Sequence, residues 1–321
     1  MLISLADTSE PLKWKVLYQL SNLEGEDLSQ FNSKWAQIDT ERRQEIMETF
    51  GSITAERYEL VFRQVSQVAL QDPDGDVRAA AVINLSTEEE PALIEPLINI
   101  LQNDMHAKTR SAAAHCLGTF VYLGALEEIP PPKIQIVAVA LLIAEAADES
   151  SSVQQAALKS LGFSNLAEVR ERIQIAWQTP DEDWQASALR AMGRSADSNR
   201  WDEQICSALE HSSEQIQIEA ARAAGELELK SAEIEVGELI YSTCAELQSV
   251  AIWALGEIGG ANARSALLEL QAVAEDDDEI QALVDEALAN IEIMEGVLDL
   301  GVLDAGNPNN LMDSEDEEIC R

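Results

Sequence analysis

Apolar and polar residues follow a pattern that recurs seven times along the chain. Each copy has a core residue at position 0, a polar residue at +1, a small or apolar residue at +4 and an apolar residue at +8. Gly often follows the last of these positions. Position 0 is occupied in turn by Val77, Thr109, Val153, Trp184, Ile216, Leu247 and Ile280. Successive copies start 32, 44, 31, 32, 31 and 33 residues apart, so the chain is an array of repeats.

The spacing inside each copy predicts an α-helix. Positions 0, +4 and +8 advance by only about 40° per step around a helix and therefore share one face. Acidic residues such as Asp74 and Asp181 precede the copies and suit helix N-termini. The Gly after +8 predicts a C-terminal stop. A second apolar-periodic segment lies between consecutive copies, so each repeat is expected to be a helix–turn–helix unit.

Neither helix of such a unit buries its apolar face alone, whereas stacked units bury a continuous core. The sequence therefore predicts an all-α fold, an α-solenoid of about seven repeats. We expect an N-terminal helical cap at 1–57, the solenoid at 58–297 and an acidic, disordered tail at 298–321. The 44-residue interval contains Pro130, Pro131 and Pro132, which predicts a stiff surface insertion plus a longer helix.

The net charge of −38 narrows the choice of partners. A surface this negative is repelled by phosphate backbones and by anionic lipids, so we expect no nucleic-acid partner and no membrane partner. The start of the chain lacks the basic segment of a signal peptide, and no apolar stretch approaches the length of a membrane span. The four cysteines are far apart. These features favour a cytoplasmic protein.

Two segments carry a resemblance to a known family. Asp74-Gly75-Asp76-Val77-Arg78 resembles the start of the second helix of a HEAT-like repeat of the phycobilisome-lyase class, and Leu255-Gly256-Glu257-Ile258-Gly259 resembles its end. The resemblance covers about residues 58–292, and the whole chain is similar to bacterial HEAT-repeat proteins. It implies a HEAT-like solenoid, a fold that serves as a scaffold and in a few enzymes.

The resemblance also implies Arg at +1, in a polar ladder between repeats. Arg78 and Arg110 keep this residue. The other five copies carry a neutral amide there: Gln154, Gln185, Gln217, Gln248 and Gln281. A strict Arg–Asp ladder is therefore not expected beyond the second copy.

The sequence lacks the catalytic motifs of enzymes that have HEAT-like repeats. Deoxyhypusine hydroxylases carry His-Glu dyads for a di-iron centre, whereas His106, His115 and His211 are followed by Ala, Cys and Ser. HEAT-like DNA glycosylases need a cationic groove, which the net charge opposes. No phosphate-binding Gly-rich loop occurs, and Cys116 fits a small core residue. We therefore expect no enzyme, no cofactor and no metal; a role as an accessory lyase of the phycobilisome-lyase-like class stays open as the alternative.

Position +6 of each copy points away from the core face and is a candidate partner surface. It holds Ile83, His115, Lys159, Arg190, Arg222, Trp253 and Glu286. Three consecutive repeats thus place a cation at the same position. These cations either pair with local acids such as Glu219 or form a ridge for an acidic peptide, with Trp253 as an apolar anchor. The candidate partner-binding residues are His115, Lys159, Arg190, Arg222 and Trp253.

A group of tryptophans, Trp177, Trp184 and Trp201, lies near the junction of the fourth and fifth repeats. Buried packing and an exposed docking patch both remain open for it. Taken together, the sequence favours a scaffold or adaptor that presents a curved surface to a protein partner. An acidic peptide would bind the Lys159/Arg190/Arg222 ridge, or a basic partner would bind the acidic surface.

Overall fold

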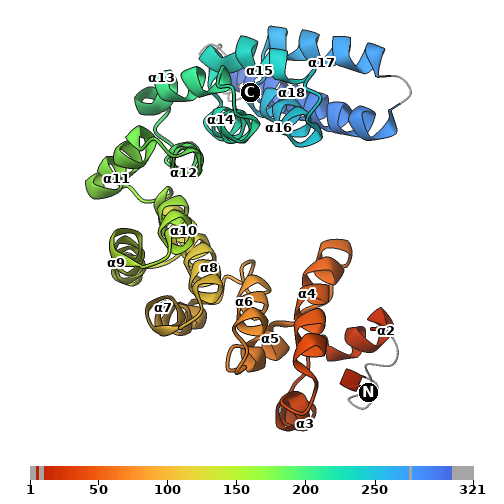
Figure 1. Ribbon diagram of the computed structural model, residues 1–321. Helices are drawn as coiled ribbons and strands as arrows, with labels where there is room; N and C mark the ends of the chain where they lie inside the picture. The colour runs from red at the N-terminus through yellow and green to blue at the C-terminus, as the bar shows by residue number, and fades with distance from the viewer. Residues whose placement is uncertain (1–4, 7–10, 275–276, 306–321) are drawn as a thin grey trace, which may run out of the picture. The chain divides into compact units, whose positions relative to one another are not determined.

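The computed structural model, which describes residues 5–6, 11–274 and 277–305, is built from paired helices (Figure 1). Every predicted copy forms the second helix of a pair, and no β-strand occurs among the described residues. The seven pairs are α5 (Arg63–Ala69) with α6 (Gly75–Ile83), α7 (Ile94–Asn103) with α8 (Ala107–Ala125), α9 (Pro131–Ala147) with α10 (Ser151–Leu161), α11 (Ala167–Gln178) with α12 (Glu182–Arg194), α13 (Ser198–Leu209) with α14 (Glu214–Glu226), α15 (Glu233–Leu239) with α16 (Ala245–Ile258), and α17 (Ala261–Val273) with α18 (Asp278–Ala305). The predicted all-helical solenoid is confirmed.

Helices of less regular length precede the first pair. They are α2 (Trp14–Leu17), the 3-10 turn η1 (Tyr18–Leu20), α3 (Gly25–Trp35) and α4 (Thr40–Glu56). Phe50 of α4 stacks on Phe62 with their ring centroids 4.0 Å apart, and both side chains are buried. This apolar contact joins the N-terminal helices to the first repeat.

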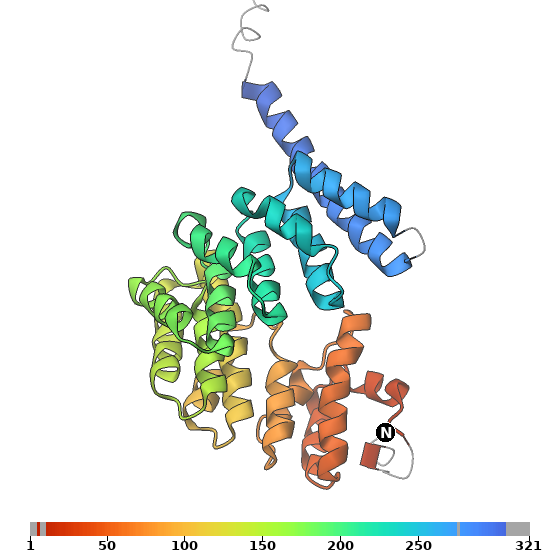
Figure 2. The same ribbon diagram turned by 45° about the horizontal axis from the view of Figure 1, so that its top comes forward.

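The chain forms two compact units, unit 1 (residues 1–195) and unit 2 (residues 196–321). In unit 1, the second helices lie side by side in one layer with α4, and the first helices form the other layer (Figure 1). The row bends so that the layer of α6, α8, α10 and α12 lies on its inner side. The helix pairs of unit 2 pack in the same way, and the end of α18 runs past its neighbours (Figure 2).

The division into units 1 and 2 does not test the domain limits that the sequence predicts. The expected boundary at 297/298 falls within α18, which continues to Ala305. The remaining residues of the acidic segment, 306–321, lie outside the described residues. The limits at 57/58 and 297/298 therefore stay predictions.

The long interval between the second and third copies is taken up by helix length. Helix α8 has 19 residues and α9 has 17, and only a short connection joins them. Pro130 is the N-cap of α9, and Pro131 and Pro132 begin its first turn. Proline is tolerated there because the first backbone N–H groups of a helix lack a partner within the helix.

The glycine after position +8 ends the helix at Gly162, as predicted, and has a packing role as well. Gly118 and Gly256 lie inside their helices, and Gly162 caps α10 with an ordinary right-handed φ of −50°. A Cβ at Gly118 would come within 2.8 Å of Ser160 Oγ, and one at Gly256 within 3.0 Å of Ala287 Cα. Glycine is therefore needed because the second helix of the next repeat passes too closely for a side chain.

A ladder of buried ion pairs links the first repeats. Arg78 of α6 donates to both carboxylate oxygens of Asp104 over 2.7 and 2.8 Å, and Arg110 of α8 donates to Asp148 over 2.8 and 2.9 Å. The ladder also starts one step earlier than the sequence indicates. Arg43 of α4 makes the same two-pronged contact with Asp72, over 2.8 and 3.1 Å.

Each acid of this ladder also organises the turn before its own repeat helix. Asp104 accepts a backbone N–H from His106, and Asp148 accepts one from Ser150. Burial opposes the charged form of both carboxylates, but their hydrogen bonds to arginine and backbone prevail. The net effect is that the pKa of each acid lies below the usual aspartate range.

The ladder becomes neutral from α10 onward, as the glutamines at +1 predict. The amide nitrogen of Gln154 donates to Asp148 O over 2.9 Å, just as Arg110 donates to Asp104 O over 2.9 Å. Gln217 and Gln248 also donate to backbone carbonyls, those of Leu209 and Ile240, which lie two residues earlier in the repeat. A backbone carbonyl thus accepts a hydrogen bond from the +1 side chain in the copies with arginine and in those with glutamine.

In the three copies that follow the ionic part of the ladder, the acids change together with the arginines. Five residues before position 0, the first three copies have Asp72, Asp104 and Asp148, the next three have Thr179, His211 and Ser242, and the last has Glu275. His211 Nδ1 and Ser242 Oγ still accept the backbone N–H two residues on, over 3.1 Å each. Charge has been removed from both partners, so neither leaves the other buried without a counter-ion.

We predict that the ladder tolerates paired but not single neutralisation. Arg110→Gln should cost about 3 kcal/mol of unfolding free energy, because it leaves the 9% exposed Asp148 carboxylate without its cation. Arg110→Gln/Asp148→Ser, which copies the later repeats, should recover more than half of this loss. Urea denaturation followed by circular dichroism measures both values.

The matched control for this pair is Arg57→Gln, which removes an exposed arginine paired with Glu59 at 3.7 Å. It should change stability by less than about 0.5 kcal/mol. If the double variant is no more stable than Arg110→Gln alone, the idea of paired neutralisation is wrong.

Candidate functional site

The inner layer of unit 1 brings together three of the predicted partner-binding residues. His115 lies on α8, Lys159 on α10 and Arg190 on α12, and these helices pack against one another in that order. His115 is exposed, and the other two side chains are half-buried. Desolvation by the neighbouring groups lowers the pKa of His115, and the positive charges of Arg194, Lys159 and Arg190 lower it further.

Arg194 joins this group although the sequence analysis did not single it out. It lies one helical turn beyond Arg190, so it falls on nearly the same face of α12. That spacing was the signal available in the sequence. We refer to His115, Lys159, Arg190 and Arg194 as the basic cluster.

The basic cluster rests against two aromatic rings. Arg194 Nη1 donates to Lys159 O over 2.9 Å, and the Arg194 guanidinium lies 5.0 Å from the ring centroid of Phe163. The Phe163 ring lies 5.0 Å from that of Tyr122, which is 44% exposed. The backbone contact and the ring fix the position of Arg194, so one edge of the cluster is rigid.

The other two predicted residues belong to unit 2. Arg222 Nε lies 3.8 Å from Glu219 Oε2, which is the local pairing that the sequence left open as an alternative. Trp253 is 38% exposed, and its indole N–H donates to the Glu257 carboxylate. The continuous ridge from Lys159 to Arg222 therefore stays a prediction.

The three neighbouring tryptophans differ in exposure. Trp201 is fully buried, and the guanidinium of Arg200 lies 5.0 Å from its ring. Trp177 and Trp184 are half-buried. Trp201 thus serves as a core residue of unit 2, as the buried interpretation expects.

Reactive groups are sparse in the described part of the chain. Cys116 is buried, its thiol donates to Leu85 O over 3.4 Å, and burial raises its pKa to about 12. It is therefore a poor nucleophile at neutral pH. The described residues contain no group of three or more His, Cys, Asp and Glu side chains that would hold a metal ion. Among the described helices, none is long and apolar enough to cross a membrane.

A cavity in unit 1 has a volume of about 560 Å³ and lies between α4 and α6. Phe50, Tyr58, Phe62 and Ile83 form its apolar walls. Asn84 stands at its edge and donates to Met47 O over 2.8 Å. This volume falls in the range of pockets that hold small organic molecules.

The proximity of the cationic groups leads to a prediction about His115. Its pKa should lie below the ordinary histidine value of about 6.5, so the imidazole is neutral at pH 7. Lys159→Gln/Arg190→Gln should raise this pKa, because two neighbouring positive charges are removed. Titration of the imidazole C–H resonances by NMR checks both shifts; an unchanged His115 pKa in the variant would show that the charges do not face it.

The comparisons with known proteins agree with the repeat architecture. Residues 247–272 match the family model "PBS lyase HEAT-like repeat". No curated protein matches the chain significantly. Among solved structures, the complex of CpcE and CpcF of phycocyanin lyase from Nostoc sp. PCC7120 is similar with 17% identity and a TM-score of 0.53, over 88% of this chain and 97% of that one.

Two further solved structures are more distant. Human deoxyhypusine hydroxylase is 15% identical over 88% of this chain and 99% of its own, with a TM-score of 0.35. Importin beta is 13% identical over 94% of this chain and 43% of its own, with a TM-score of 0.43. Residues 247–272 are thus similar to a PBS lyase HEAT-like repeat, and the paired helices give the chain the solenoid fold of HEAT-repeat proteins.

Proposed function

We propose that this protein is a scaffold or adaptor without enzymatic activity, and that it binds an acidic segment of a partner protein at the basic cluster. The observation that carries the proposal is that Lys159, Arg190 and Arg194 lie on α10 and α12, close enough to His115 of the neighbouring α8 for their charges to lower its pKa. Such a concentration of cations is unusual in a chain with 21 basic and 59 acidic residues.

The chemistry of the cluster suits a carboxylate-rich peptide. Arg offers several N–H donors in a planar fork that matches a carboxylate, and Lys adds a point charge. Tyr122 and Phe163 provide an apolar surface beside these donors. Arg and aromatic residues are the side chains that contribute most at protein interfaces.

The acidic surroundings favour selective binding. The rest of the surface repels an acidic peptide, so productive contact is limited to the cluster. In the solved complex to which this chain is similar, CpcE and CpcF are themselves bound to each other. Protein partners are therefore compatible with this fold.

The test is direct binding of a capped, fluorescein-labelled Glu/Asp-rich peptide containing one Phe, measured by anisotropy. Lys159→Gln/Arg190→Gln should weaken binding about tenfold or more, because two charge-assisted contacts are lost. Binding should also weaken as salt is raised. Arg194 is not mutated in this variant, because its contacts with Lys159 O and Phe163 support the fold.

The matched control is Arg57→Gln/Lys133→Gln, which removes the same charge from two exposed residues outside the cluster. It should change the affinity by less than about twofold. Equal losses in the two variants would mean that net charge alone governs binding. No measurable binding to the wild-type protein at low salt would contradict the proposal.

An accessory lyase is the second candidate. The match to a PBS lyase HEAT-like repeat and the cavity of about 560 Å³ in unit 1 favour it over other enzymes. A lyase of this class needs to bind a bilin. Adding a free bilin to the purified protein and recording its absorbance tests this role, and an unchanged bilin spectrum at saturating protein would exclude it.

A further inference from the structure

A pocket of about 350 Å³ lies between α16 and α18 in unit 2. Trp253 of α16 lines it together with Leu283 and Ile293 of α18. Two carboxylates, Glu257 and Glu286, also line it. The pocket thus combines an aromatic face with negative charge.

The wall residues are held in place by specific contacts. The Trp253 ring packs directly against Gly225 of the preceding repeat. A Cβ at that glycine would lie only 2.7 Å from the ring. The Glu257 carboxylate, which lines the pocket together with Trp253, accepts the amide N–H of Asn290 over 3.1 Å. Asn290 also donates to Gly256 O over 3.2 Å. The indole and the carboxylate are therefore presented in a fixed relation.

Positive charge is missing from this arrangement. Among the residues that the structure describes, no Lys or Arg forms an ion pair with Glu257 or Glu286, and none lines the pocket. Burial raises the pKa of Glu257, and the negative charge of Glu228 raises it further. A cation in the pocket would relieve both the desolvation and the repulsion.

We propose that this pocket binds the arginine side chain of a basic segment in a partner protein. A guanidinium stacks on an indole face and donates two parallel hydrogen bonds to a carboxylate. The Trp253 ring and the fixed Glu257 carboxylate offer these two contacts together, and Glu286 adds charge at the rim. The apolar side chains of Leu283 and Ile293 suit the methylene stem of arginine.

The strongly acidic composition of this part of the chain supports the choice of partner. Residues 201–321 contain 4 basic and 29 acidic side chains. The resulting field attracts a basic segment from a distance, while the pocket selects one side chain from it. This site is separate from the basic cluster in unit 1 and does not depend on the function proposed for it.

The experiment uses the full chain labelled with 5-fluorotryptophan and observed by fluorine NMR. The probe is a capped Gly-Arg-Gly peptide, and the same peptide with citrulline, which keeps the shape of arginine without its charge, is the reference. Trp253→Phe assigns the Trp253 resonance. We expect the arginine peptide to shift this resonance saturably, the citrulline peptide to leave it unmoved, and the buried Trp201 resonance to stay constant.

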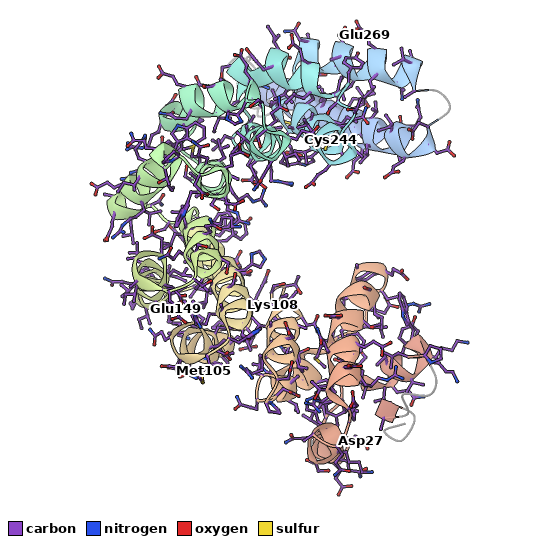
Figure 3. All side chains as sticks on the ribbon, in the orientation of Figure 1. Asp27, Met105, Lys108, Glu149, Cys244 and Glu269 are labelled. Atoms are coloured by element: carbon purple, nitrogen blue, oxygen red, sulfur yellow. The ribbon has the colours of Figure 1, made fainter. Side chains whose placement is uncertain are left out.

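Matched variants separate the pocket from the general negative charge. Glu257→Gln/Glu286→Gln should weaken the arginine peptide about tenfold, because the charge is lost while the shape is kept. Glu246→Gln/Glu269→Gln removes two exposed acids of the same unit, and Glu269 lies on the outer edge of α17 (Figure 3). This control should change the affinity by less than about twofold.

Three results would overturn the proposal. One is a Trp253 resonance that does not move at saturating arginine peptide. Another is an equal loss of affinity in the two paired variants, which would mean that binding is diffuse. The third is free methylguanidinium binding as tightly as the peptide, since the site would then serve a small cation instead of a protein segment. Circular dichroism melting of each variant confirms that it is folded.

Discussion

Close contact between the second helices of adjacent repeats sets the geometry on which the rest of this molecule depends. The glycine at +9 of one repeat faces the residue at +7 of the next, as Gly118 faces Ser160 and Gly256 faces Ala287. At this separation most residues at 0, +4 and +8 are buried; Val77, Ala81 and Leu85, for example, are completely inaccessible. The same contact determines where the +6 side chains emerge, so a core constraint defines the candidate binding surface.

Polar contacts at the start of each second helix complement this apolar contact. The residue at +1 donates to a carbonyl in the preceding turn, whether it is Arg110 or Gln154. A buried carbonyl needs such a partner, whereas the charge on the donor is optional if the opposing acid is also absent. Unit 1 therefore uses Arg43, Arg78 and Arg110 in the contacts between its repeats.

The sequence was sufficient to predict the repeat register, because helical periodicity is decided by which side chains are buried. It was misleading for the glycines, since a glycine within a helix and a glycine that ends one look alike until the neighbouring helix is known. Arg43 was missed because the segment before the first repeat lacks the repeat motif, although its contact with Asp72 is the same. Arg194 was missed because only one position per repeat was followed along the layer.

The binding features were harder to predict because they depend on contacts between helices. The side chain of Trp253 was expected to serve as an apolar anchor for an acidic peptide. The structure places it beside Glu257 in the lining of a pocket with α18, and its role as an anchor stays a prediction. Nothing in the spacing of α16 alone indicates that Asn290 holds this carboxylate.

The two forms of the ladder also restrict the order in which one repeat can evolve into the other. If Asp148 is lost first, Arg110 keeps its bond to Asp104 O, and its long side chain can turn toward water. If Arg110 is lost first, a short, buried carboxylate remains with little besides a backbone N–H from Ser150. The less costly mutational path from an ionic to a neutral repeat therefore begins at the acid, and lineages that diverged midway should retain the arginine more often than the aspartate.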